Sequence, residues 1–196
     1  MWCLKIFLAN IDGEITVNTL MPEFFTAKDG RKVKLRSLRW EDLDDCIEFI
    51  NLLVDEGSDI AKETKVTRDE EADWLGKRLA SMEKGELVDV VAEVDGKMVA
   101  NAEIGCRRGN MSHVGDIGIG IRAGYRGIGI GTELMRLLIE QSRRIGLKTI
   151  VLDVFETNNI AKGLYAKAGF KESGRIPKGV YKNGKYIDLI RMVQEL

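Results

Sequence analysis

The sequence contains few of the residues that build disulfide frameworks or metal sites. It has three cysteines, Cys3, Cys46 and Cys106, and a single histidine among 196 residues. The cysteines are odd in number, widely spaced and not grouped with the histidine, so neither a disulfide framework nor a zinc site is expected. We expect incidental or buried thiols, with Cys46 on the apolar face of a helix, and no metal.

Long hydrophobic runs and an excess of one charge are absent as well. The longest apolar run near the start, Ile6 to Ala9, follows Lys5 and is far shorter than a signal-peptide core or a membrane span. Thirty basic and 31 acidic side chains give a net charge of −1, which argues against nucleic acid as a partner. With 44% hydrophobic residues, the composition predicts one globular domain that is cytoplasmic and has no membrane partner.

The pattern of apolar residues predicts a mixed α/β chain. Asp95-Gly96 and Asn183-Gly184 are the turn signals of two hairpins. Helices are expected over residues 40–55, after Thr67, and over 132–145 and 159–168; strands are expected over 33–38, 87–94, 97–106, 113–121 and 149–155, with two final strands around Asn183-Gly184. These elements predict a mixed sheet with helices on both sides and one crossover through the helix 132–145.

Residues 1–32 precede these elements as an N-terminal extension. Strand patterns over residues 3–20 surround the turn-rich stretch Asn10-Ile-Asp-Gly13, which favours a hairpin. The sequence does not choose among three roles for it, which are a strand added to the sheet edge, a cover over the active site and a contact in a homodimer.

The most informative segment is rich in glycine and runs from Asp116 to Met135. An alternating apolar run leads into Gly127, Gly129 and Gly131, and an amphipathic helix follows. Without a Cβ atom the backbone there can turn tightly and direct several N–H groups at one ligand, while the helix start adds partial positive charge. The segment therefore predicts a site for a phosphate or pyrophosphate.

Two known phosphate loops fit this segment poorly. Gly118-x-Gly120-x-x-Ala123 has the letters of the dinucleotide fingerprint, but the helix is expected only after Gly131 and the acidic residue expected further on is missing. The nucleotide-triphosphate loop needs a lysine before its Ser or Thr, and Gly131-Thr132 has none.

A third pattern matches better. Arg126-x-x-Gly129-x-Gly131 resembles the pyrophosphate-binding signature of the GNAT N-acetyltransferase superfamily, whose members use acetyl-coenzyme A. A second stretch, from Asn158 through Ala161, Leu164 and Tyr165 to Gly169-Phe170, resembles that family's Asn-x-x-Ala-x-x-Leu-Tyr helix. The resemblance covers roughly residues 33–195, which marks 33–196 as the catalytic domain. One departure is Ala123-Gly124, where relatives often have Pro-Glu.

The resemblance implies a GNAT-like fold, with a mixed, mostly antiparallel sheet whose strands splay at the acetyl-coenzyme A site. It also implies an enzyme that moves an acetyl group from acetyl-coenzyme A to a primary amine by direct attack. The acceptor stays open between a small molecule, such as a polyamine or amino acid, and a protein N-terminus. The alternative is a non-catalytic module that binds or senses an acyl-coenzyme A.

The resemblance also assigns residues to the coenzyme. Backbone N–H groups of the glycine loop would hold the pyrophosphate, strand residues would pair with the pantetheine arm, and an asparagine at the start of the second motif would contact that arm. The loop residues are Arg126, Gly127, Ile128, Gly129, Ile130, Gly131 and Thr132. The strand residues are Ile119, Gly120 and Ile121, and the asparagine is Asn158 or Asn159. Gly118 and Gly120 are interpreted as marks of a close backbone approach.

Tyr165 is expected, by resemblance, to protonate the departing thiolate and to lie against the coenzyme; a phenol carries its proton at neutral pH. A carboxylate is expected to deprotonate the amine. Asp116 leads narrowly over Glu103, and Asp153 and Glu156 stay open.

Two further features are weaker. His113 has the right kind of pKa for a base but follows a loop sequence, where a solvent-facing side chain is expected. The acidic stretch Asp55, Glu56, Asp59 and Glu63 lies in a region that often lines the acceptor site in this family, and it would attract a cationic amine.

Overall fold

The central element is an eight-stranded sheet with the strand order β3-β4-β5-β6-β7-β8-β10-β9. The computed structural model describes residues 8–9, 15–16 and 20–196. Every neighbouring pair in the large sheet is antiparallel except β7 and β8. Its strands are β3 (Glu23–Thr26), β4 (Lys32–Ser37), β5 (Leu87–Val94), β6 (Lys97–Cys106), β7 (Val114–Ile121), β8 (Thr149–Phe155), β9 (Lys171–Lys182) and β10 (Lys185–Glu195).

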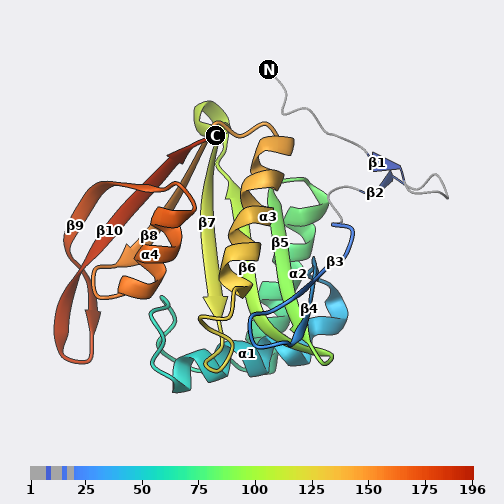
Figure 1. Cartoon of the computed structure of the whole chain (residues 1–196), viewed down its shortest axis with the longest axis horizontal. Helices are drawn as coiled ribbons and strands as arrows, with labels where there is room; N and C mark the ends of the chain where they lie inside the picture. The colour runs from blue at the N-terminus through green and yellow to red at the C-terminus, as the bar shows by residue number, and fades with distance from the viewer. Residues whose placement is uncertain (1–7, 10–14, 17–19) are drawn as a thin grey trace.

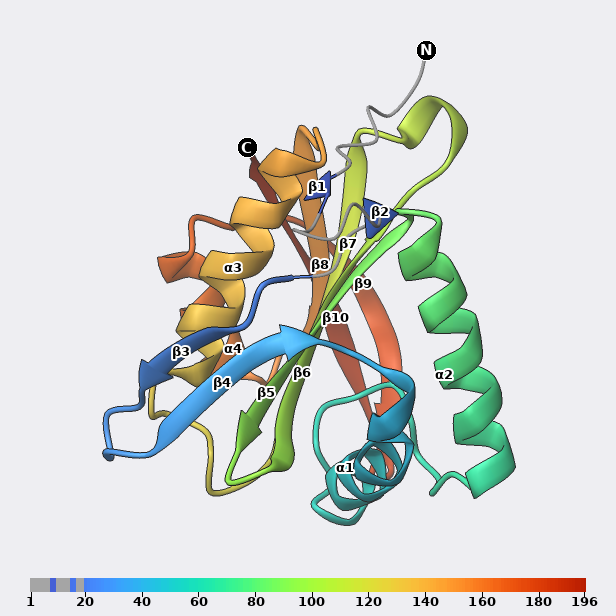
Figure 2. The same ribbon diagram turned by 90° about the vertical axis from the view of Figure 1, so that its right-hand side faces the viewer.

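Helices cover both faces of this sheet, as the sequence predicted. In Figure 2 the sheet separates α3 (Ile130–Arg144) and α4 (Asn159–Lys167) from α1 (Leu43–Asp55) and α2 (Arg68–Glu83). One apolar core lies under α3 and α4, and a second lies under α1 and α2. β5 contributes to both cores, which explains why its sequence is nearly continuous in apolar residues.

Both predicted hairpin turns are confirmed. Asp95 and Gly96 have φ values of 51° and 77° and join β5 to β6, and Asn183 and Gly184 have values of 51° and 76° and join β9 to β10. Two consecutive residues with positive φ give the turn a twist that matches the twist of the flanking strands. Asn, Asp and Gly tolerate this conformation better than other residues, so these dipeptides determine where the strands reverse.

Some element boundaries differ from the sequence-based prediction. The short strand β3 was not predicted; it pairs with β4 and extends the large sheet at its edge. The helix α3 begins at Ile130 rather than after Gly131, because Gly129, with a φ of 104°, acts as its N-cap. At the N-terminus, β1 (Leu8–Ala9) pairs antiparallel with β2 (Ile15–Thr16), and the turn Asn10–Gly13 lies outside the described residues.

The start of α2, which was expected after Thr67, is fixed by a capping box. The Thr67 hydroxyl accepts from the N–H of Glu70, and the Glu70 carboxylate accepts from the N–H of Thr67 at 2.9 Å. These contacts satisfy two donors that a helix start would otherwise leave without partners. We expect Thr67→Ala to lower the free energy of unfolding by about 1 kcal/mol. Urea unfolding followed by circular dichroism measures this change; Thr67→Ser is the control and should retain most of the stability.

The sheet opens between β7 and β8. These parallel strands pair only at Val114 with Thr149, Gly115 with Ile150 and Asp116 with Val151. Beyond Asp116, β7 continues to pair with β6, while β8 continues to pair with β10. The stretch 117–121 of β7 therefore has no strand partner on its β8 side, and the predicted splay is confirmed.

Candidate active site

The glycine loop connects the open end of β7 to α3, as Figure 1 shows. Gly124, Gly127 and Gly129 have φ values of 79°, 77° and 104°, a region of backbone conformation that residues with a Cβ atom rarely adopt. Within the described part of the chain, the N–H groups of residues 126–129 have no hydrogen-bond acceptor. Together with the start of α3, these N–H groups have the arrangement expected of an anion-binding site, and the binding itself stays a prediction.

The turn between β3 and β4 holds one side of the loop. The N–H of Lys28 donates to the Ile128 carbonyl at 2.9 Å, and the Arg31 guanidinium donates to the Gly124 carbonyl at 2.6 Å. The same guanidinium stacks over the ring of Tyr125, 4.3 Å from its centroid. The loop conformation is therefore fixed by protein contacts, which prepares its N–H groups for a ligand.

The segment after α1 holds the other side. The Arg126 side chain donates to the Ile121 carbonyl at 2.7 Å, to Glu56 at 2.6 Å and to the Ser58 hydroxyl at 2.9 Å. Glu56 also accepts from the Ala123 N–H at 3.0 Å. The Arg126 guanidinium thus stabilises the conformation of the loop. A contribution of its charge to the binding of a pyrophosphate stays a prediction.

Glu56 joins two parts of the loop, so its removal should loosen the anion site. We expect Glu56→Gln to weaken acetyl-coenzyme A binding about fivefold, since one charge-assisted contact at a partly exposed position contributes about 1 kcal/mol. Isothermal titration calorimetry gives the dissociation constant. Glu48→Gln, on the exposed side of α1, is the matched control and should bind as the wild type does.

The same segment also contacts the hairpin at the far edge of the sheet. The Lys182 ammonium donates to the carbonyls of Gly57 and Ser58 at 2.7 and 2.9 Å and to the Asp59 carboxylate at 2.6 Å. The segment after α1 therefore links the glycine loop to β9.

Tyr165 lies in α4 at the edge of the core. Its side chain is 7% exposed and packs on Phe170, with ring centroids 6.1 Å apart. Burial raises the pKa of its phenol to about 12. The group therefore keeps its proton at neutral pH, and its hydroxyl has no hydrogen-bond partner among the described residues.

Asn158 is the N-cap of α4. Its side-chain oxygen accepts from the Ala161 N–H at 3.0 Å, which accounts for asparagine at this position by helix capping. Its side-chain NH₂ group has no acceptor in the described part of the chain, so a contact with the coenzyme arm stays a prediction. Asn159, the first residue of α4, makes no side-chain hydrogen bond there either.

The carboxylates considered as bases are all paired with arginines. Asp116, which is half exposed, receives two hydrogen bonds from Arg107 at 2.6 and 2.7 Å. Glu103 pairs with Arg78 of α2. The other two pairs are Asp153 with Arg191 and Glu156 with Arg175.

Glu103 lies against the open half of β7. A Cβ atom at Gly118 would lie 2.9 Å from a carboxylate oxygen of Glu103. At Gly120 it would lie 3.2 Å from Leu53 and 3.3 Å from Phe49, both in α1. The close approach that these glycines indicated is therefore made by side chains on the α1 face. It also brings Glu103 and Phe49 to the strand where a thioester is expected.

The remaining sequence candidates have ordinary surroundings. His113 is exposed, as expected. In the acidic stretch, Asp55 pairs with Lys65, Glu56 with Arg126 and Asp59 with Lys182, so that only Glu63 of this stretch has no ion pair among the described residues.

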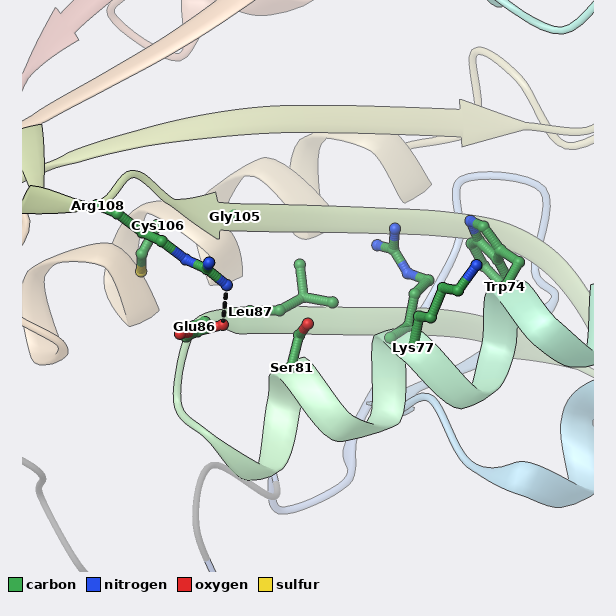
Figure 3. A pocket seen from close by; sticks show the side chains of 9 residues that line it. Trp74, Lys77, Ser81, Glu86, Leu87, Gly105, Cys106 and Arg108 are labelled. Carbon is green, nitrogen blue, oxygen red and sulfur yellow. Dashed lines mark hydrogen bonds and ion pairs between the residues drawn. The ribbon is translucent and has the colours of Figure 1, made fainter.

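Two hollows lie along α2. Figure 3 shows the first, of about 330 Å³, where Lys77 and Ser81 of α2 face the strands and Arg108 pairs with Glu86. The second, of about 260 Å³, lies between α1 and α2 over β6. Trp74 borders both.

The second hollow contains a residue that the sequence analysis missed. Glu71 is 5% exposed, and burial raises the pKa of its carboxyl. It stands four residues before Leu75, on the same stripe of α2, and an acidic residue in an apolar stripe was the available signal. Cys46 lines the same hollow; it is buried as predicted, and burial raises the pKa of its thiol to about 12, so it is not a reactive thiolate.

Metal-binding clusters and membrane-spanning helices are both absent from the described residues. In residues 8–9, 15–16 and 20–196, no cluster of three or more His, Cys, Asp or Glu side chains is arranged to hold a metal ion. None of the four α-helices there has the length and hydropathy needed to cross a membrane.

Comparison with known proteins gives consistent matches. The family model described as "Acetyltransferase (GNAT) family" matches residues 38–170. The L-amino acid N-acetyltransferase AaaT of Escherichia coli K12 is 34% identical over 107 residues, which are 54% of this chain and 66% of that protein. The L-methionine sulfoximine/L-methionine sulfone acetyltransferase of Pseudomonas aeruginosa PAO1 is 34% identical over 85 residues, 43% of this chain and 47% of that protein.

Solved structures extend the match to the fold. A ribosomal-protein-alanine N-acetyltransferase from Brucella melitensis superimposes with a TM-score of 0.74 and 26% identity, covering 83% of this chain and 99% of that one. A GNAT-family acetyltransferase from Streptococcus pneumoniae superimposes with a TM-score of 0.75 and 25% identity, covering 84% of this chain and 99% of that one. The matched part of this chain spans between about half and two thirds of the length of the curated relatives above. The family match covers most of the chain, and on this ground the protein belongs to the GNAT acetyltransferase family.

Proposed function

We propose that this protein transfers the acetyl group of acetyl-coenzyme A to a primary amine. The observation that carries the proposal is the fixed glycine loop, whose N–H groups lie at the start of α3 and next to the half of β7 that β8 leaves unpaired. The loop suits a pyrophosphate, and the open strand edge suits an extended arm that pairs with Ile119, Gly120 and Ile121. The names of relatives that acetylate amino acids support an amine as the acceptor.

The reaction follows from this placement. The amine nitrogen attacks the thioester carbonyl carbon, a C–N bond forms, and the C–S bond breaks. A backbone N–H of the open half of β7 stabilises the oxyanion that develops. The thiolate of coenzyme A leaves with the electron pair of the C–S bond and takes a proton from Tyr165. The nitrogen releases a proton to solvent as the amide forms, and Tyr165 regains a proton from solvent.

The ammonium form of the acceptor must first lose a proton. Between the two carboxylates predicted for this step, the contact of Glu103 with Gly118 favours Glu103, because Asp116 lies at the last position where β7 still pairs with β8. Glu103 forms an ion pair with Arg78, and as the base it would accept the proton directly or through water.

A panel of amines tests the proposal. Release of coenzyme A thiol is followed with polyamines, amino acids, aminoglycosides and peptides that have free N-termini or lysines. We expect turnover with one class, above hydrolysis without an amine. Tight coenzyme binding with no turnover in any class would contradict the proposal and favour a module that senses an acyl-coenzyme A.

Three other expectations stand as proposals: a cytoplasmic location, a domain boundary near residue 33 and a homodimer contact through residues 1–32. Cell fractionation tests the first. Light scattering and thermal unfolding of the full chain and of a variant without residues 1–32 test the other two.

A further inference from the structure

The hollow between α1 and α2 differs from a simple packing defect. Its walls are apolar and come from α1, the segment before α2, α2 itself and β6, and they include Phe49, Ile50, Val66, Trp74 and Met98. Three charged side chains line it as well: Glu70, whose carboxylate accepts from the Thr67 N–H, and Glu71 and Lys62, which have opposite charges. A hollow of about 260 Å³ is smaller than the usual sites for drug-sized ligands, so it suits a small molecule.

Glu71 has no partner in the described structure. Its side chain is more than nine-tenths buried, yet neither a hydrogen bond nor an ion pair reaches its carboxylate. Lys62 and Arg78 act on it only through their charges. A buried carboxylate without a partner is destabilising, which is the arrangement expected of a group that waits for a cationic ligand.

Lys62 lies at the exposed rim of the same hollow. It makes no ion pair with any described carboxylate, although its charge is felt by both Glu70 and Glu71. An anionic group and a cationic group that face one hollow without pairing leave room for a ligand with both charges between them.

The hollow also borders the strand where the chemistry is expected. Asn101 lines the hollow and pairs in register with Gly120 of β7. Phe49 lines it too, and its ring lies 3.3 Å from the position that a Cβ atom at Gly120 would occupy. The hollow opens on the α1 and α2 face, whereas the helix that starts the anion site lies on the opposite face. An acceptor and the coenzyme would thus approach β7 from opposite sides.

The wall of the hollow is held in place by side-chain contacts. The Asn51 amide oxygen accepts from the Val66 N–H at 2.8 Å, and its NH₂ group donates to the Val66 carbonyl at 3.2 Å. This pair fixes the segment before α2 against α1. The hollow is therefore a defined part of the fold, and Glu71 lies in the first turn of α2, facing it.

We propose that this hollow binds the acceptor as a free α-amino acid with an apolar side chain, whose ammonium contacts Glu71 and whose carboxylate contacts Lys62. This inference rests on the proposed function and identifies its substrate class. The apolar walls hold the side chain of the amino acid, and the two charged contacts orient its nitrogen toward β7. Peptides, amides and simple amines lack the neighbouring carboxylate and lose the contact with Lys62.

Three acceptors that share one branched side chain test the role of Lys62: leucine, leucinamide and isoamylamine. For the wild type we expect kcat/KM to be about tenfold higher with leucine than with the other two, because one charge-assisted contact is lost in each of them. Lys62→Met should lower kcat/KM for leucine to the value of the other two acceptors and leave kcat/KM for those two unchanged. Equal kcat/KM for all three acceptors with the wild type would overturn the proposal.

Glu71→Gln tests the other contact. It preserves the shape of the side chain and should raise KM about tenfold for every amine, while the dissociation constant of acetyl-coenzyme A stays the same. Asp73→Asn removes the same charge from the exposed side of α2 and should leave KM unchanged. An unaltered acceptor KM in a folded Glu71→Gln protein would also overturn the proposal.

Failure of the proposed function gives a different result. In that case no amine is acetylated even with acetyl-coenzyme A bound, and calorimetric titration of leucine still tests the hollow. Binding of leucine that Glu71→Gln and Lys62→Met each weaken would support the site in a protein that senses amino acids. No binding of leucine by the wild type would overturn the site as well.

Discussion

Replacing Gly129 with valine should weaken binding of acetyl-coenzyme A roughly thirtyfold. Gly129 has a φ of 104° and is the N-cap of α3, a conformation that a β-branched residue adopts only under strain of about 2 kcal/mol. The loop then either changes its conformation or keeps it only under strain. In both cases the free energy of coenzyme binding to the N–H groups of residues 126–129 becomes less favourable. Isothermal titration calorimetry with acetyl-coenzyme A measures the change.

The control for this variant is Gly174→Val. Gly174 lies in the exposed strand β9, has no atom within 4 Å of a Cβ position and has no positive φ. Circular dichroism should show that both variants are folded. Wild-type affinity in a folded Gly129→Val protein would show that the coenzyme is not held by this loop.

Replacing Tyr165 with phenylalanine should lower kcat about a hundredfold, the usual contribution of a general acid, with little change in coenzyme affinity. The phenol has no hydrogen-bond partner among the described residues, so its loss should hardly alter stability. Stopped-flow or steady-state release of thiol measures kcat, and equilibrium titration measures affinity. Tyr186→Phe removes a phenol from an exposed position on β10 and should keep wild-type activity.

The pH dependence gives a second test of Tyr165. Burial raises its pKa from the ordinary value of 10 to about 12, so the phenol stays protonated through neutral and moderately alkaline conditions. The wild-type rate should therefore not fall near pH 10 through loss of this proton. An unchanged kcat in Tyr165→Phe would mean that the thiolate takes its proton from elsewhere.

Local sequence determines much of the fold. Asp95-Gly96 and Asn183-Gly184 fix two hairpins because few other residues accept positive φ at both turn positions. Thr67 and Glu70 fix the start of α2 in the same local way. By contrast β3 was missed, because a four-residue edge strand gains most of its stability from pairing with β4, which its own sequence does not reveal.

The candidate site was predictable where a motif describes backbone shape. The glycine spacing predicted the conformation of the loop, whereas the role of Tyr165, expected from its place in a helix motif, stays a prediction. Side-chain partners are set by tertiary contacts, so the sequence could not show that Arg126 turns to Glu56. It likewise could not show that Asp116 pairs with Arg107, or that Glu71 has no partner among the described residues.

The most direct test of the central claim is to follow the acetyl group itself. Acetyl-coenzyme A labelled in the acetyl carbonyl carbon is incubated with the protein and an accepted amine, and the label and the free thiol are both measured. With direct transfer, label appears as an amide of the amine in step with thiol release, and acid-quenched protein carries no label. Thiol release without labelled amide, or label that accumulates on the protein before it reaches the amine, would contradict direct transfer to an amine.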